Sequence, residues 1–185
     1  MGKNLIDLYT DYLISSFSQT TATGLSTLVD GCLSHDQITT FLAESDLDSK
    51  SLWLHVKPMV RELEKAKGTG VLIFDDSIAV KPYSDENEIV CYHWDHSKKH
   101  YIKGINFLNC LFEKDGISLP VAAEIIEKDE CFIDPKTGKE KRRSSITKNQ
   151  LMQKMLTVTQ NNRVLYDYVL ADSWFSSADN IKSIK

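Results

Sequence analysis

Two short apolar runs, each ending at an aspartate, constrain the fold of this 185-residue chain more than any other feature. The first is VLIFDD at residues 71–76, and the second is VLYDYVLAD at residues 164–172. A continuous apolar run after a glycine or a turn is typical of a central strand buried on both faces. Carboxylates at the end of such a strand are unfavourable unless solvent or a cation compensates their charge. The pattern therefore leaves two alternatives, a pair of solvated turns or a metal site.

The N-terminal third of the chain has helical patterns. Apolar residues recur at helical spacing through residues 1–68, and Ser34 with Gln37 has the sequence of a capping box. A helix is expected over residues 48–67, kinked or interrupted at Pro58. We expect residues 1–68 to form a small helical region, for which DNA binding is one candidate role.

Strand and helix patterns alternate through residues 69–185. Residues 105–128 are expected to form a hairpin around a Lys-Asp-Gly turn, and a helix is expected over residues 147–162. A hairpin followed by a helical crossover predicts a mixed sheet, in which the strand at 164–171 runs parallel to the strand at 71–75. The expected fold class is α/β, with a mixed sheet flanked by helices and a small helical region before it.

This strand order brings the aspartates together, because parallel neighbouring strands end at the same edge of a sheet. Asp75 or Asp76 is then expected within a few ångströms of Asp172. Hard cations such as Mg²⁺ prefer carboxylate oxygens, and one ion between two carboxylates relieves their repulsion. Two ions about 4 Å apart can bind the attacking and the leaving oxygen of a phosphoryl transfer.

Several stretches in this order resemble the DDE transposases of bacterial insertion sequences, whose catalytic domain has the RNase H-like fold. The matching stretches are residues 71–109, 136–152 and 168–185, and residues 33–45 are similar to the N-terminal part of such proteins. The resemblance implies an RNase H-like domain that cleaves DNA at insertion-sequence ends and transfers the strand. It also implies Mg²⁺ or Mn²⁺ as cofactor, two ions in the complete enzyme, and a dimer on transposon-end and target DNA.

Carried onto this sequence, the resemblance assigns the two catalytic, metal-binding aspartates to Asp76, which Ser77 follows, and to Asp172. Strand alternation points Asp75 to the opposite face, where it has a supporting role or is a simple cap. Trp174 is the candidate for a wall of the site.

A third family carboxylate, a glutamate on a later helix, has no counterpart after Asp172. Glu124 is the nearest substitute and is disfavoured, because it lies in the expected hairpin. We therefore expect either a truncated gene product or an excerpt of a longer protein, and in both cases a chain that is inactive by itself. The alternatives are a non-catalytic DNA-binding remnant and a metal-dependent nuclease or phosphatase that uses the same aspartates.

Charge is spread unevenly, although the net charge is only -4. Residues 97–154 hold 12 Lys and Arg against 8 Asp and Glu, whereas residues 1–96 are acidic. Most such runs are merely solvated, but a DNA partner is also consistent with a basic middle segment. The candidate phosphate-binding residues are Lys139, Lys141, Arg142, Arg143 and Lys148.

The segment HWDHSKKH, residues 93–100, has histidines at spacings found in zinc sites. Zinc usually requires a second ligand pair elsewhere, so a loop near DNA phosphates or near the acidic site is the favoured interpretation. No apolar run is long enough to span a bilayer, and no signal peptide pattern opens the chain, so we expect a cytoplasmic protein without membrane contact.

Overall fold

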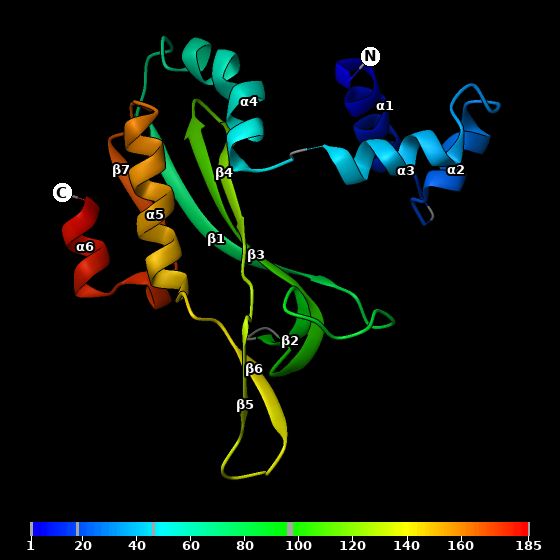
Figure 1. Ribbon diagram of the computed structural model, residues 1–185. Coiled ribbons are helices and arrows are strands. Elements are labelled where there is room, and N and C mark those ends of the chain that lie inside the picture. Colours follow the sequence, from blue (N-terminus) through cyan, green and yellow to red (C-terminus); the bar gives the residue numbers. More distant parts are fainter. Residues whose placement is uncertain (1, 18, 46, 96–97, 185) are drawn as a thin grey trace. The chain divides into compact units, whose positions relative to one another are not determined.

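The structure is a computed structural model, shown as a ribbon in Figure 1. The chain divides into two compact units, residues 1–46 and residues 47–185. The residues that the structure describes are 2–17, 19–45, 47–95 and 98–184.

The first unit consists of three helices around a small apolar core. Tyr12, Leu25 and Ile38, one from each helix, are the buried residues of this core. The capping box of the third helix is present, because the Ser34 hydroxyl accepts from the Gln37 amide and the Gln37 side chain accepts from the Ser34 amide. The helices are α1 (Gly2–Ser15), α2 (Ala22–Leu28) and α3 (His35–Glu44).

The second unit contains a five-stranded mixed sheet, a small separate hairpin and helices. Strand β3 is the longest; β1 pairs along one edge of it, while β2 and β4 share its other edge. Strand β7 pairs with β1. The strands are β1 (Val71–Val80), β2 (Val90–Asp95), β3 (His100–Lys114), β4 (Ile117–Ile125), β5 (Glu130–Ile133), β6 (Glu140–Arg143) and β7 (Tyr168–Ala171). The helices are α4 (Ser49–Leu63), α5 (Lys148–Asn161), the short 3₁₀ helix η1 (Ser173–Phe175) and α6 (Ala178–Ile184).

Strand β1 does not end at the aspartates, as the sequence pattern suggested, but continues to Val80. Its second half pairs antiparallel with β3, which satisfies the backbone groups on that side beyond the carboxylates. Leu72 and Phe74 are fully buried on the face that carries the core. Because side chains alternate along a strand, Asp76 lies on this core face and Asp75 on the opposite face.

The expected hairpin is confirmed as β3 and β4. Its turn residues Asp115 and Gly116 both have positive φ angles, 54° and 77°, which an Asp-Gly pair adopts in a two-residue turn. The pairing shifts between Cys110 and Leu111, where β4 contains one extra residue, Val121. This bulge changes which β4 side chains face the core beyond it.

The predicted parallel pairing of β1 with β7 is confirmed, with Phe74 opposite Ala171. The second strand is shorter than expected, however, and in the described part of the chain it lies at an edge of the sheet. Tyr168 and Leu170 are 64% and 55% exposed, so the expectation of burial on both faces is wrong for β7.

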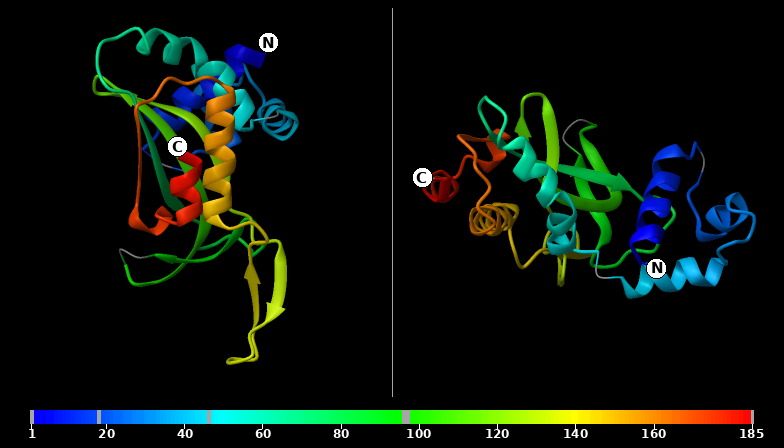
Figure 2. Two further views of the ribbon diagram at one scale, coloured as in Figure 1. Left: turned by 90° about the vertical axis from the view of Figure 1, so that its left-hand side faces the viewer. Right: turned by 90° about the horizontal axis from the view of Figure 1, so that it is seen from above.

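One apolar core lies between the sheet and two helices, α4 and α5, with α6 packed against α5 (Figure 2). Helix α4 contributes Trp53 and Val60 to this core and runs through Pro58 as one helix, without the expected interruption. Helix α5 begins at the expected capping box of Thr147 and Gln150. Because α4 packs against the sheet, it belongs to the second unit.

The second unit thus has the mixed α/β architecture of the RNase H-like fold, as the sequence predicted. Within the described residues, no helix is both long enough and apolar enough to cross a membrane.

The start of β7 is fastened to the start of β1 at Gly70. The Gly70 amide donates to Asp167 Oδ2 at 2.8 Å, and the Asp167 amide donates to the Gly70 carbonyl at 2.7 Å. A Cβ atom at Gly70 would lie 2.8 Å from the Leu165 carbonyl oxygen and 3.0 Å from the Phe112 ring. The backbones can approach this closely only because residue 70 lacks a side chain.

We expect Gly70→Ala to lower the free energy of unfolding by about 1–3 kcal/mol, because the added methyl group overpacks a fixed backbone contact. Urea unfolding followed by circular dichroism measures the change. Asp167→Asn, which keeps one acceptor oxygen for the Gly70 amide, should have a smaller effect. An unchanged unfolding midpoint for Gly70→Ala would contradict this account of the β1–β7 junction.

Candidate functional site

Asp76 lies on the core face of β1 and forms an ion pair with the first residue of α5. Lys148 Nζ lies 2.6 Å from Asp76 Oδ2, and the two side chains are 30% and 28% exposed. The pair is therefore partly withdrawn from water, where a carboxylate without compensation is unfavourable. Lys148, predicted from sequence as a DNA-phosphate ligand, is thus brought to a predicted catalytic aspartate.

Asp172 follows β7 directly and caps the short helix η1. Its Oδ1 accepts from the Trp174 amide at 3.3 Å and from the Ser173 hydroxyl at 2.9 Å. The side chain of Asp172 is exposed, whereas Phe175, at the end of η1, is buried in the main core. The core contact of Phe175 fixes the turn that carries Asp172.

Asn180 is a positioning residue that the sequence analysis missed. It is 1% exposed, and its Nδ2 donates to Asn149 Oδ1 at 2.8 Å and to the Phe175 carbonyl at 2.9 Å. Its Oδ1 accepts from Gln153 Nε2 at 2.8 Å. A single amide thus joins α5, η1 and α6, and no periodic pattern in the sequence indicates such a residue.

The two aspartates lie on neighbouring parallel strands, at the ends toward which both strands run. Since Phe74 pairs with Ala171, Asp172 follows one residue after the last pair and Asp76 two residues after it. Neighbouring strands are about 4.8 Å apart and residues within a strand about 3.3 Å apart, so the register places these positions close to each other.

The donor chemistry of these positions fits a hard divalent cation. Both offer carboxylate oxygens, and Asp76 already binds a cation, the ammonium group of Lys148. Among the described residues, no three His, Cys, Asp or Glu side chains gather closely enough to hold a metal ion. Asp76 and Asp172 are therefore not part of such a cluster, and a metal site at these two residues stays a prediction.

Glu124 does not join them. It lies opposite Leu108 on β4, and Leu108 lies opposite Asp76 on β1. The buried Leu108 therefore separates the two carboxylates by two strand spacings, about 10 Å. Glu124 instead binds Lys154 on α5, with Nζ 3.2 Å from Oε2.

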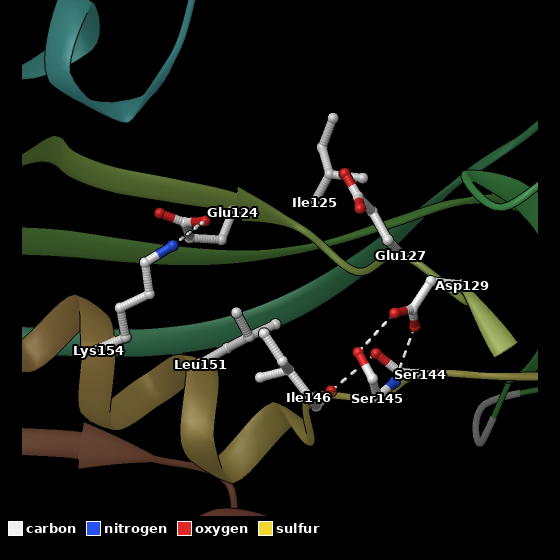
Figure 3. A pocket seen from close by; sticks show the side chains of 9 residues that line it. All are labelled: Glu124, Ile125, Glu127, Asp129, Ser144, Ser145, Ile146, Leu151 and Lys154. Carbon is white, nitrogen blue, oxygen red and sulfur yellow. Dashed lines mark hydrogen bonds and ion pairs between the residues drawn. The ribbon is translucent and has the colours of Figure 1, made fainter.

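Glu124 and Lys154 line a cavity of about 210 Å³ between the end of β4 and the start of α5 (Figure 3). Asp129 lies on its rim and accepts from the Ser145 amide at 2.8 Å and from the Ser145 hydroxyl at 2.5 Å. These bonds fasten the loop before α5, and therefore Lys148, to the segment after β4. The lining residues are Glu124, Ile125, Glu127, Asp129, Ser144, Ser145, Ile146, Leu151 and Lys154.

The basic run extends from the turn of the small β5–β6 hairpin through strand β6, a strand that was not predicted from the sequence. Lys141 forms an ion pair with Asp134, and this hydrogen bond lowers the pKa of Asp134 to about 2. Arg143 Nε lies 2.7 Å from Glu130 Oε2, and its guanidinium lies 5.5 Å from the Phe132 ring. Ion pairs at the surface contribute little to stability, and phosphate binding by these two basic groups stays a prediction.

His93 is a core residue of β2. It is 4% exposed, and its Nε2 lies 3.3 Å from Cys91 Sγ, with a further hydrogen bond to the backbone of Gly104. Burial lowers the pKa of His93 to about 4, and the charges of Lys128 and Lys148 act in the same direction. A neutral imidazole with both nitrogens bonded is a structural group, and His96 lies outside the described residues.

Asp75 and Trp174, the two candidates for a supporting role, lie on different elements. Asp75 is exposed on the face of β1 opposite Asp76, across from Asn109 of β3. Trp174 is 65% exposed, one residue after the start of η1 and two after Asp172. Trp174 stays a candidate wall of the site, and Asp75, on the face of β1 opposite Asp76, stays a candidate for a supporting role.

Comparison of the sequence with known protein families agrees with this architecture. The family model of the DDE superfamily endonucleases matches residues 3–184, nearly the whole chain. The chain therefore belongs to the DDE superfamily endonucleases, and a nuclease or transposase type of activity follows at the level of the family. No curated protein and no solved structure matches the sequence.

The buried imidazole should make stability depend on pH. The pKa of His93 in the folded state is below the value of about 6.5 for an exposed histidine, so the unfolded chain binds the extra proton first. Stability from this group is complete above about pH 6.5 and is lost as the pH falls towards 4, with about 2 kcal/mol lost by pH 5. Urea unfolding of the wild type and His93→Gln at several pH values measures the difference.

His100→Gln is the matched control, because His100 is exposed and its substitution should leave the pH dependence of the wild type. If His93→Gln also retained the full dependence between pH 7 and 5, the buried neutral state of His93 would be disproved.

Proposed function

We propose that this chain forms the metal-binding centre of a DNA transposase that cleaves the ends of an insertion sequence and transfers the strand. The observation that supports the proposal is the parallel pairing of β1 with β7, in which the last pair, Phe74 with Ala171, lies two residues before Asp76 and one residue before Asp172. Membership of the DDE superfamily endonucleases supports DNA as the substrate. The cytoplasm, where bacterial DNA lies, is the proposed place of action, and a dimer on paired ends the proposed assembly.

Asp76 and Asp172 are the proposed ligands of Mg²⁺ or Mn²⁺. The bound cations would supply activation of the attacking oxygen and stabilisation of the leaving oxygen. The protein supplies the positions: β1 and the Gly70 junction fix Asp76, while η1 and Asn180 fix the turn of Asp172. Trp174 is the proposed wall, which limits access of water and orients the DNA strand beside the carboxylates.

The proposed phosphate-binding surface is the β5–β6 hairpin with the start of α5. Lys141, Arg142 and Arg143 lie on β6, and Lys139 lies directly before it in the turn of the hairpin. Phosphate contacts supply affinity without sequence information, so they position DNA for cleavage at the carboxylates.

Replacing either aspartate by asparagine should weaken Mn²⁺ binding by at least about tenfold, since a neutral amide is a poorer ligand for a hard cation, and should abolish any metal-dependent DNA cleavage. Isothermal titration with MnCl₂ measures binding. Cleavage is measured on DNA that carries the sequences flanking the coding region. Asp75→Asn is the matched control and should bind Mn²⁺ like the wild type.

Each outcome separates the candidate functions. Mn²⁺ binding that is equal in the wild type, Asp76→Asn and Asp172→Asn would reject these residues as ligands. DNA binding without cleavage and without metal dependence would instead favour a non-catalytic DNA-binding protein.

Neutralising the hairpin should reduce the salt dependence of DNA binding. Each phosphate contact contributes about 0.9 units to the slope of log affinity against log salt on duplex DNA, so loss of four contacts should flatten it by about 3–4 units. Fluorescence anisotropy between 50 and 300 mM KCl measures the slope. The substituted residues are Lys139, Lys141, Arg142 and Arg143, each changed to glutamine.

A control with the same change in charge replaces four lysines in or near α4. An equal slope for the wild type and the hairpin variant would show that the hairpin is only a solvated surface. The control lysines are Lys50, Lys57, Lys65 and Lys67.

A further inference from the structure

The ion pair between Lys148 and Asp76 is held from both sides. Asp76 is fixed within β1 by its pairing with Leu108 of β3, two residues beyond the last β1 residue that pairs with β7. Lys148 is the first residue of α5, whose start is fixed by hydrogen bonds between Thr147 and Gln150. The ammonium nitrogen and the carboxylate oxygen, 2.6 Å apart, are thus brought together by two rigid elements rather than by two mobile side chains on one surface.

The ammonium group lies at the oxygen that a metal ion would bind. A carboxylate oxygen that accepts from an ammonium group at this distance directs electron density to that cation. A divalent ion at Asp76 must therefore displace Lys148 or share the carboxylate with it, and two cations at one carboxylate repel each other.

A second pair on the same helix provides an internal comparison. Lys154 binds Glu124 at 3.2 Å, also a lysine of α5 with a carboxylate of the sheet. Glu124 lies beyond the buried Leu108, on the side of β3 that is away from β1 and β7. Lys148 is distinguished from Lys154 by its place at the proposed metal ligand.

We propose that Lys148 is a built-in cation that occupies Asp76 in the metal-free protein and competes with the divalent ion for it. This proposal rests on the proposed function in one respect, that Asp76 is a metal ligand. Metal loading exchanges one cation for another at Asp76, so the carboxylate keeps a positive neighbour in both states. The displaced ammonium group stays on the first turn of α5, beside the carboxylates, where a DNA phosphate is its next partner.

Competition between Lys148 and the divalent ion predicts the direction in which each substitution changes Mn²⁺ affinity. Lys148→Met removes the ammonium group and keeps the length of the side chain, so Mn²⁺ should bind more tightly, roughly fivefold for a partly exposed pair. Lys148→Arg keeps the positive charge and should bind Mn²⁺ within about twofold of the wild type. Lys154→Met, the matched control on the same helix, should also leave Mn²⁺ affinity unchanged.

Isothermal titration with MnCl₂ and Mn²⁺ electron paramagnetic resonance, both on the 185-residue protein, provide the affinities without requiring catalysis. Thermal unfolding of each variant checks that the fold is retained. If folded Lys148→Met bound Mn²⁺ as tightly as the wild type or more weakly, the proposal would be overturned. Lys148 would then have no effect on Mn²⁺ affinity or would increase it. A Lys154→Met variant that binds as tightly as Lys148→Met would also overturn it, by showing a general effect of charge.

The same measurements distinguish a failure of the proposed metal site from a failure of the proposed competition. If Asp76→Asn lowers Mn²⁺ affinity while Lys148→Met does not raise it, Asp76 is a ligand and only the competition is wrong. If Asp76→Asn has no effect on Mn²⁺ binding, the metal site itself is wrong and the competition is wrong with it.

Discussion

The parallel contact between β1 and β7 is the constraint on which the rest of the second unit depends. These strands are far apart in sequence, and their pairing covers only four residues, from Val71 with Tyr168 to Phe74 with Ala171. So short a ladder needs a fixed start, which the reciprocal hydrogen bonds of Gly70 and Asp167 provide. Because side chains alternate at every residue, a slip by one position would change which β1 side chains lie nearest to Asp172. The geometry of the site is therefore set at the other end of the strands.

Helix α5 packs on the sheet and also contacts the residues that position the two aspartates. Its buried face fills the core above the sheet, while its first turn reaches both aspartates by different means. Lys148 contacts Asp76 directly, and Asn149 reaches Asp172 indirectly, through Asn180 and the backbone of Phe175. A shift of α5 would disturb both carboxylates at once. The loop before the helix is correspondingly fastened by two hydrogen bonds from Ser145 to a carboxylate after β4.

Local sequence patterns correctly predicted the elements that are determined by neighbouring residues. The apolar run at 71–74, the Asp-Gly turn and the capping box at Thr147 predicted a strand, a hairpin and a helix that the structure contains. Features that depend on distant partners were missed. Strand β1 continues beyond Asp76 because β3 pairs with it, and Glu124 faces the core because a bulge shifts the register of β4. The pairing of Lys148 with Asp76 joins residues 72 positions apart, which no local pattern encodes.

The placement of Asp76 explains why a lysine is found there. Asp76 lies in the middle of a strand, on the face that carries Leu72 and Phe74, and its side chain is only 28% exposed. A partly buried carboxylate of this kind is stabilised by a cation or a proton beside it. A site that depended on a metal alone would leave an uncompensated charge at the edge of its own core whenever the metal dissociates. An ammonium group on a flexible stem removes that penalty, since it can bind the carboxylate in the metal-free state and withdraw when a divalent ion arrives. The same charge that makes Asp76 useful to a metal ion thus requires Lys148 within reach.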